Sequence, residues 1–256
     1  MRNKTFILGL AVLMALATSC ASHYHVTAID RTRQLIDNTF DKPVPQTVTD
    51  FMKPFNQEVD KLMSPVLGTA AKDLTVKRPE APLSNLLPDV LVWSGKLYDE
   101  KPDFGIYNIG GIRASIAKGD ITIGDVFDVA PFENKVCFIT LSGKKVLELM
   151  GQIAYRGGEG ISKEVRIVAT KDGKLKSATI SGKEIDPDAS YRVATVDYLS
   201  HGNDRMTAFK DGTDRRELPG EDDLTRTLFM KYIKEQTANG KLVDCDIEGR
   251  FTIAEE

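Results

Sequence analysis

The chain has 256 residues, of which 41% are hydrophobic, and its formal net charge is −3. A mature part of roughly 230 residues can bury a sizeable core, as one large domain or as one domain with an extension. No run of basic residues occurs, which argues against a nucleic-acid polymer as a partner. Small anionic ligands remain candidates, because the charge of a pocket can differ from the net charge.

Residues 1–19 predict a signal peptide that does not belong to the fold. Arg2 and Lys4 form its positive end, and the apolar segment 6–16 is too short to span a bilayer. Small residues then lead directly to Cys20. A cysteine in this place resembles a bacterial lipobox, which implies cleavage before Cys20 and lipid attachment to its thiol; ordinary cleavage with an unmodified cysteine is the alternative. We therefore expect an exported protein, lipid-anchored to the cell envelope on its periplasmic side or at the cell surface.

Residues 20–65 predict a tether that ends in a helix. Apolar residues recur at helical spacing between about residues 45 and 64, which indicates one apolar helix face. We expect this face to be buried as core. Its members are Val48, Phe51, Met52, Phe55, Val59, Leu62 and Met63.

Residues 66–254 predict a mixed α/β (α+β) domain with several antiparallel strands. Helices are expected from Ser84 to about Leu97, over 143–154 and over 224–233, and a short strand and helix over 121–129 after a turn at Gly119-Asp120. Strands are expected over 104–107, 134–141, 165–170, 178–181, 191–198 and 247–253, with a hairpin turn at 171–173. A glycine-rich loop is expected over 156–162 and an exposed charged segment over 216–222.

The segment after the strand 104–107 carries a candidate ligand site. Asn108 is followed by Gly110 and Gly111 and then by Arg113. Glycines let another group approach the backbone closely, so this turn presents bare N–H groups beside a guanidinium. That combination suits an anion such as phosphate. A tight turn with a surface arginine is the alternative.

Cysteine and histidine give no sign of a metal centre. Cys137 lies in an apolar strand pattern, which favours packing, and a disulfide between Cys137 and Cys245 remains open. The histidines are His23, His25 and His201, and no Asp-x-His is followed by a His-x-His. We expect no metal site, no cofactor and no catalytic residue in this chain, and a solvated loop position for His201.

Four motifs in register resemble the C-terminal domain of the bacterial and animal 5′-nucleotidase family. They are Lys77-Arg78-Pro79-Glu80, Asn108-x-Gly-Gly-x-Arg113, Pro131-Phe132-x-Asn134 and the segment Asp197-Tyr198-Leu199-Ser200-His201-Gly202-Asn203-Asp204. The resemblance covers roughly residues 66–253 and implies that family's mixed sheet with packed helices. In that family this domain binds the nucleotide, and a separate N-terminal metallophosphatase domain cuts it.

The resemblance implies a role for each matching residue on the nucleoside side. Phe132 and Tyr198 would hold the base between two flat faces, with Tyr in place of the usual Phe. Asp204 would accept hydrogen bonds from the ribose hydroxyls, Asn108 would contact base and ribose, and Asn134 would add a further contact. The alternatives are that Phe132 and Tyr198 are core aromatics and that Asp204 caps a loop.

On the phosphate side the resemblance implies Arg113 and the backbone of Gly110 and Gly111. Lys77 stands where the family has a second arginine, so it offers a point charge in place of a planar fork. A surface ion pair is the alternative for Arg113. Asn203 replaces a glycine before Asp204, and asparagine tolerates a positive φ at such a turn.

The resemblance therefore predicts that this chain is the nucleotide-recognition half of a 5′-nucleotidase. A separate metallophosphatase chain would hold the divalent metal ions, because the family's chemistry uses two metals that activate a water molecule. The substrate would be a nucleotide, cleaved to a nucleoside and phosphate. A stand-alone nucleotide- or nucleoside-binding lipoprotein for uptake, and a degenerate domain kept for protein contacts, are the alternatives.

Overall fold

The computed structural model describes residues 24–38 and 43–254, and the chain divides into two compact units, Met1–Phe51 and Met52–Glu256. The signal peptide and Cys20 lie outside the described residues, as does His23. Residues 24–36 form neither helix nor strand. Among the residues that the structure describes, no helix combines the length and the apolar character needed to cross a membrane.

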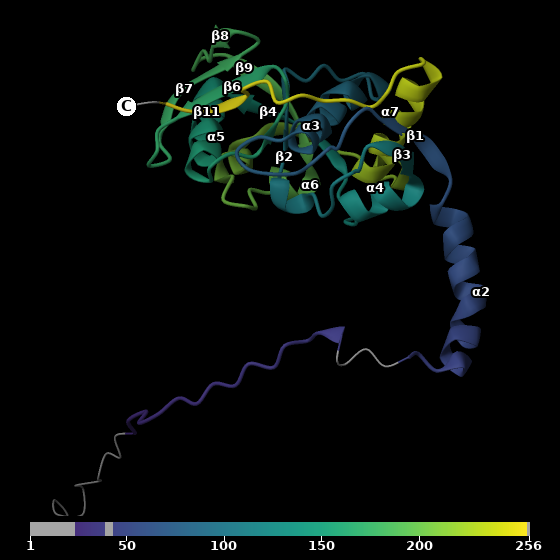
Figure 1. The fold of residues 1–256 in the computed structure, drawn as a ribbon. Coiled ribbons are helices and arrows are strands. Elements are labelled where there is room, and N and C mark those ends of the chain that lie inside the picture. The colour runs from purple at the N-terminus through teal and green to yellow at the C-terminus, as the bar shows by residue number, and fades with distance from the viewer. Residues whose placement is uncertain (1–23, 39–42, 255–256) are drawn as a thin grey trace, which may run out of the picture. The chain divides into compact units, whose positions relative to one another are not determined.

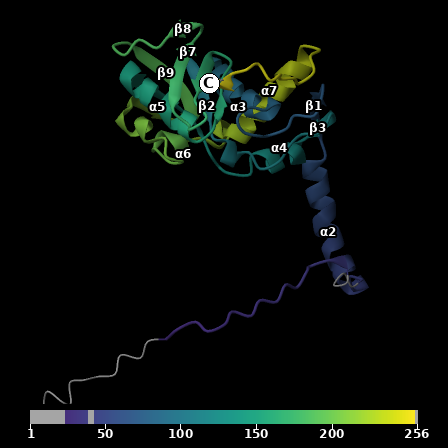
Figure 2. The ribbon, with the colours of Figure 1, turned by 60° about the vertical axis from the view of Figure 1, so that its left-hand side comes forward.

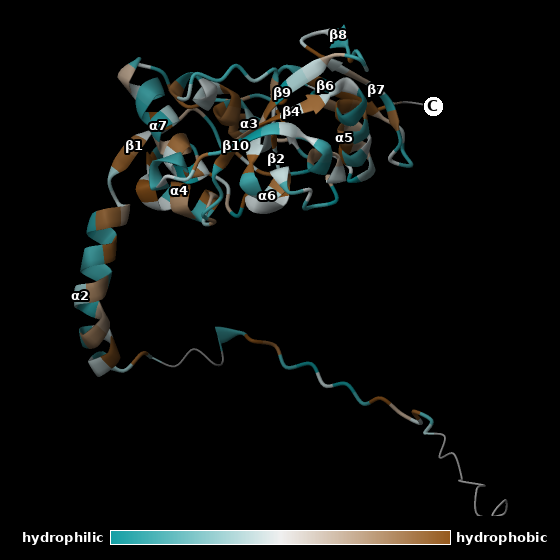
Figure 3. Ribbon diagram, turned by 180° about the vertical axis from the view of Figure 1, so that it is seen from behind, coloured by the Kyte–Doolittle hydropathy of each residue, from teal (hydrophilic) through white to brown (hydrophobic). Residues whose placement is uncertain are grey.

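The predicted helix near residues 45–64 is present as α2 (Gln46–Met63). The prediction that its apolar face belongs to the core is wrong, because none of its residues is buried. Hydrophobic and hydrophilic residues are intermixed along it (Figure 3). A helical period identifies an apolar face but not what covers it, and the core of the second unit is filled by that unit's own side chains.

The main sheet of the second unit has five strands in the order β10-β4-β9-β2-β5 (Figure 1). Its centre is β4 paired antiparallel with β9 over seven residues, from Val136 opposite Val196 to Ser142 opposite Ser190. The pair β2–β9 is parallel, so the sheet is mixed, as predicted. The strands are β10 (Thr213–Glu217), β4 (Val136–Ser142), β9 (Ser190–Val196), β2 (Phe104–Tyr107) and β5 (Gly160–Ile161).

Two smaller sheets complete the second unit. A four-stranded sheet has the order β11-β6-β7-β8, and β1 pairs with β3 in a two-stranded sheet. The predicted hairpin is present as β6 and β7. The strands are β11 (Phe251–Ile253), β6 (Val165–Ala169), β7 (Leu175–Ile180), β8 (Lys183–Glu184), β1 (Val66–Ala70) and β3 (Gly119–Thr122).

Helices pack on the main sheet. Helix α3 contacts β2, β5 and β9, and α5 contacts β4 and β9. Figure 2 shows α3 beside β2 and α5 beside β9. The approach of α3 to β2 is close, because a Cβ on Gly105 would lie 2.5 Å from the carbonyl oxygen of Pro88. Glycine is therefore required where β2 passes this helix. The helices of the second unit are α3 (Pro82–Ser94), α4 (Ile123–Val129), α5 (Gly143–Tyr155), α6 (Asp197–Ser200) and α7 (Thr225–Ala238), with 3₁₀ turns η2 (Gly95–Leu97), η3 (Ile109–Gly111), η4 (Thr207–Asp211) and η5 (Glu221–Asp223).

Several local predictions need correction. Helix α3 begins at Pro82 and not at Ser84, so Pro88 lies inside the helix. Gly119-Asp120 belongs to β3, where Gly119 pairs with Ala70. The glycine-rich loop 156–162 contains β5, and the charged segment 216–222 begins within the edge strand β10. These strands are short or wholly exposed, so their formation depends on neighbours distant in sequence and not on their own hydrophobic pattern.

Candidate functional site

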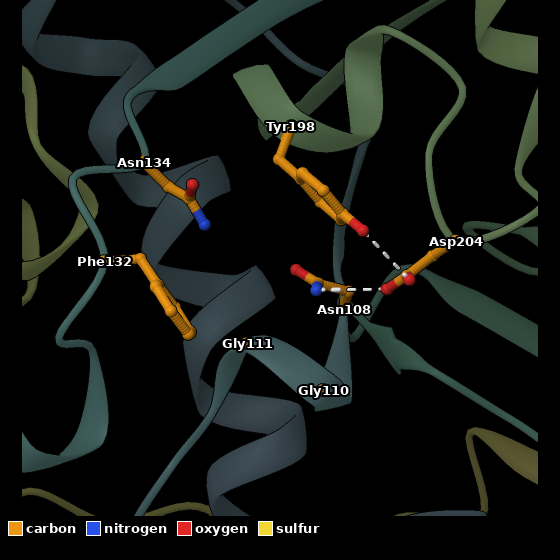
Figure 4. A pocket seen from close by; sticks show the side chains of 7 residues that line it. All are labelled: Asn108, Gly110, Gly111, Phe132, Asn134, Tyr198 and Asp204. Atoms are coloured by element: carbon orange, nitrogen blue, oxygen red, sulfur yellow. Dashed lines mark hydrogen bonds between the residues drawn. The ribbon is translucent and has the colours of Figure 1, made fainter.

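A pocket of about 330 Å³ opens where β2 and β9 end in the main sheet. It is lined by residues of η3, of the loop between α4 and β4, and of α6 with the loop that follows it. Figure 4 shows these side chains converging on one space. The lining residues are Asn108, Gly110, Gly111, Phe132, Asn134, Tyr198 and Asp204, all of them predicted site residues.

The first wall of the pocket is the turn after β2. All of β2 is buried, and Asn108 ends it as the N-cap of η3, where its carbonyl oxygen accepts a hydrogen bond from the N–H of Gly111 at 2.9 Å. A Cβ on Gly111 would lie 2.9 Å from Asn108 Oδ1. Glycine at 111 therefore makes room for the Asn108 side chain.

Asn108 holds a buried acceptor without a partner in the wall of the pocket. Its side chain is buried, with 5% of the residue exposed, and Nδ2 donates to Asp204 Oδ2 at 3.1 Å. Its Oδ1 is buried and has no hydrogen-bond partner. Figure 4 shows this oxygen directed toward the space between Phe132 and Tyr198. A buried acceptor without a partner costs about 1–3 kcal/mol, which a donor group on a ligand would relieve.

The second wall is the loop after α6. The Tyr198 hydroxyl donates to Asp204 Oδ1 at 3.2 Å, so each Asp204 oxygen accepts one hydrogen bond from a lining residue. Partial burial and the Asp204 carboxylate raise the pKa of Tyr198 above its ordinary value, which keeps the hydroxyl a donor. Asp204 and Arg205 have φ of +54° and +62°. Such left-handed residues other than glycine cost of order 1 kcal/mol each and concentrate at ligand sites.

Asn203 does not take the positive φ that its place in the motif suggests. Positive φ falls on Gly202, Asp204 and Arg205. The Asn203 side chain instead donates from Nδ2 to the carbonyl oxygen of Tyr198 at 2.8 Å, which closes the loop onto α6. The turn therefore forms without a second glycine.

The two aromatic rings are not core residues. Phe132 is 46% exposed and Tyr198 39% exposed, and the two side chains project into the pocket from opposite walls (Figure 4). Exposed aromatic faces in a pocket form a surface on which a flat ring can stack. The short helix α4, which begins with a capping box between Thr122 and Asp125, leads into the loop that carries Phe132.

Two predicted residues are not part of the lining. Arg113 is exposed, and its Nη1 donates to the carbonyl oxygen of Gly110 at 3.3 Å, which places it beside the pocket wall. Lys77 is exposed as well, and its backbone N–H and carbonyl oxygen both contact Ser84 Oγ at 3.4 Å. Its neighbour Arg78 points instead to Glu159 and to the carbonyl oxygen of Gly158.

Glu159 was not predicted, although it contacts the turn that forms one pocket wall. Its side chain is fully buried and accepts from Ile109 N at 2.6 Å, from Arg156 Nε at 2.7 Å and from Arg78 Nη2. Arg156 Nη2 lies 3.8 Å from Asp204 Oδ2. An acidic residue between Gly158 and Gly160 was the only signal in the sequence, because Ile109 and Arg78 are 50 and 81 positions away.

The described residues contain no group of three or more His, Cys, Asp and Glu side chains that could hold a metal ion. His201 lies on the surface, with Nε2 3.0 Å from Glu217 Oε1. Cys137 and Cys245 are both free. Burial raises the pKa of Cys137 to about 11 and that of Cys245 to about 12, so neither is an activated thiol.

Comparisons with known proteins relate this chain to 5′-nucleotidases. The family model for the 5′-nucleotidase C-terminal domain matches residues 66–211, a range that contains all residues of the pocket. The 5′-nucleotidase of Vibrio cholerae is 29% identical over 163 residues, which cover 60% of this chain and 29% of that protein. Protein UshA of Escherichia coli is 30% identical over 164 residues, which cover 58% of this chain and 30% of that protein.

A solved structure agrees with the sequence matches. The 5′-nucleotidase precursor of Thermus thermophilus superposes with a TM-score of 0.69 at 27% identity, over 82% of this chain and 44% of that chain. The chain thus spans less than half the length of each of these three proteins. The predicted fold class is confirmed, and the chain belongs to the family of the 5′-nucleotidase C-terminal domain.

Proposed function

We propose that this chain is the nucleotide-recognition half of a 5′-nucleotidase and acts in nucleotide catabolism with a separate metallophosphatase chain. The observation that carries the proposal is the buried, unpaired Asn108 Oδ1, directed between two exposed aromatic side chains beside the Asp204 carboxylate. A nucleoside matches this set of groups, because it combines a flat base, N–H donors and a pair of hydroxyls. The volume of about 330 Å³ lies within the usual range for small-ligand pockets.

In this proposal the base stacks between Phe132 and Tyr198. Stacking a base on an aromatic side chain is worth ~1–3 kcal/mol in nucleic-acid binders. Asn108 Oδ1 accepts a hydrogen bond from the base or sugar, and Asn134 lines the same side of the space. Asp204 accepts from the ribose hydroxyls, since an ionised carboxylate offers about four acceptor positions and two are in use.

In this proposal the phosphate group of the bound nucleotide extends out of the pocket past Gly110, toward Arg113. Gly110 is exposed and a Cβ there would meet nothing within 4 Å, so the backbone is open to a ligand. The Arg113 guanidinium, held on the carbonyl oxygen of Gly110, can turn to the phosphate at little cost because it is exposed. Lys77 is proposed as a further positive charge on this side.

We assign the divalent metal ions and the hydrolytic step to the partner chain. Metal ions held there would supply the activated water that attacks the phosphorus atom. This chain contributes binding and orientation of the nucleotide. Lipid attachment at Cys20 would hold it on the cell envelope, and a partner on the same surface would meet it at a raised effective concentration.

Calorimetry with AMP, adenosine and a UDP-sugar tests recognition, and a phosphatase assay of the purified chain with added divalent metal tests the division of labour. We expect binding without turnover, and turnover on addition of the metallophosphatase that co-purifies from the native envelope. Hydrolysis by this chain alone would contradict the split enzyme. Binding together with co-purification of a transporter would favour an uptake role, and no binding by any ligand would favour a domain kept for protein contacts.

A further inference from the structure

Behind the pocket, a buried carboxylate joins its two walls. Glu159 Oε2 accepts from the N–H of Ile109, the residue after Asn108, at 2.6 Å. Glu159 Oε1 accepts from Arg156 Nε at 2.7 Å. Because the side chain has no exposed surface, these contacts are protected from water, and charge-assisted hydrogen bonds are the stronger kind.

Arg156 carries this connection to the opposite wall. Its Nη2 lies 3.8 Å from Asp204 Oδ2, the oxygen that also accepts from Asn108. The contacts thus form a closed circuit from Asn108 through Asp204, Arg156 and Glu159 to Ile109, which is bonded covalently to Asn108. We call these residues the Glu159 circuit. The Glu159 circuit fixes the side chains of Asn108 and Asp204 relative to one another.

The charges of the circuit bear on Asp204. Arg156 supplies a positive charge beside a carboxylate whose two oxygens each already accept one hydrogen bond. Asp204 is therefore held in one orientation, with its remaining acceptor positions free for a ligand. Without Arg156, only a partly exposed tyrosine and one amide would orient Asp204, on a backbone with φ of +54°.

We propose that Glu159 and Arg156 are positioning residues that make the pocket selective for a ribose with its hydroxyls in place. This inference rests on the proposed nucleoside recognition and deepens it. Neither residue touches the ligand: Arg156 orients Asp204, and Glu159 holds both Arg156 and the turn that carries Asn108. The expected signature is a selective loss of hydroxyl recognition, which a general loss of stability would not produce.

The test compares the dissociation constants of adenosine and 3′-deoxyadenosine by calorimetry. In the unaltered chain we expect adenosine to bind roughly ten times more tightly, the scale of one hydrogen bond to a charged group. In Arg156→Met this ratio should fall below about three, and Arg156→Lys should restore part of it. Glu159→Gln should lower the ratio as well and weaken both ligands, because the Asn108 turn loses a charged acceptor.

A matched pair elsewhere in the chain provides the control. Glu100 accepts from Arg192 at 2.8 Å and from Arg216 at 3.1 Å, so it holds two arginines as Glu159 does, and neither Glu100 nor Arg192 lines the pocket. Glu100→Gln and Arg192→Met should lower the melting temperature and leave the adenosine ratio unchanged. Melting curves by circular dichroism identify any variant that does not fold.

The outcomes separate the two proposals. If the unaltered chain binds neither adenosine nor AMP, the proposed function fails. If it binds adenosine but shows no preference over 3′-deoxyadenosine, or if a folded Arg156→Met variant keeps the full preference, nucleotide recognition stands and the positioning role is wrong. An equal loss of the ratio in Arg192→Met would also overturn the positioning role, because the effect would then be general.

Discussion

Gly111 decides whether Asn108 can occupy its observed position, which makes Gly111→Ala an informative substitution. A methyl group there would lie 2.9 Å from Oδ1, 3.2 Å from Nδ2 and 3.3 Å from Cγ of Asn108. Ordinary van der Waals contact begins near 3.4 Å, so the amide must move by several tenths of an ångström or leave its rotamer. The backbone itself is not strained, because Gly111 does not have a positive φ.

The displacement has a cost in stability and a cost in binding. Moving the amide stretches the Nδ2 bond to Asp204, now 3.1 Å, and an off-rotamer side chain costs about 0.5–1.5 kcal/mol. A destabilisation of about 1–2 kcal/mol lowers the melting temperature by roughly 2–8 °C in a protein of this size. Loss of the Oδ1 contact to a nucleoside adds about 1.4 kcal/mol, or a tenfold weaker dissociation constant.

Calorimetry with adenosine and thermal melting measure the two effects, and Gly110→Ala is the comparison. A Cβ on Gly110 meets nothing within 4 Å, so this substitution should not move Asn108 and should change the melting temperature less. Wild-type affinity in Gly111→Ala would refute the role given to Asn108 Oδ1. An equal loss of stability in both variants would refute the steric argument.

Three further predictions follow from the pocket and the thiols. Tyr198→Phe keeps the ring and removes one partly exposed hydrogen bond to Asp204, so calorimetry should show an adenosine affinity within about threefold of the parent. Phe132→Ala removes a stacking ring, so it should weaken adenosine binding by about tenfold or more. Because the pKa of Tyr198 is raised, its hydroxyl stays protonated and affinity should be constant between about pH 7 and pH 9; a decline over that range would contradict the assignment. At about pH 8 a thiol with a pKa of about 11, as for Cys137, is only about 0.1% thiolate, so a disulfide-exchange reagent should modify Cys137 and Cys245 slowly until the chain is unfolded.

The sequence predicts the elements that bury a regular apolar pattern. Helix α5 is expected over 143–154 and found over Gly143–Tyr155, and β2 is found at its expected residues, because every residue of that strand is buried. Strand β10 fails this test, since all of its residues are exposed and it forms by pairing with β4 at the sheet edge. Such a strand is specified by its neighbour and not by its own composition.

The residues of the pocket also divide into those that the sequence predicts and those that it does not. Asn108, Phe132, Tyr198 and Asp204 stand in motifs whose order and spacing can be recognised, and the fold brings them together. Glu159 has no motif: its function depends on two arginines and a backbone N–H that become neighbours only after folding. Lys77 shows the opposite case, because a plausible register in the sequence does not bring its side chain into the lining.

The arrangement of the pocket bears on how recognition and chemistry could be divided between two chains. The end that would hold the nucleoside is preorganised: Asn108 donates to Asp204, Glu159 accepts from the N–H of the next residue, Ile109, and Arg156 lies 3.8 Å from Asp204. At the opposite end Gly110 and Arg113 are exposed, and the Arg113 guanidinium contacts only the carbonyl oxygen of Gly110, at 3.3 Å, among the described residues. Affinity would therefore come from the base and sugar, with little ordering cost, while the phosphate remains accessible. The proposed partner that supplies metal ions would need that accessibility, and the asymmetry between the buried and the open end would provide it.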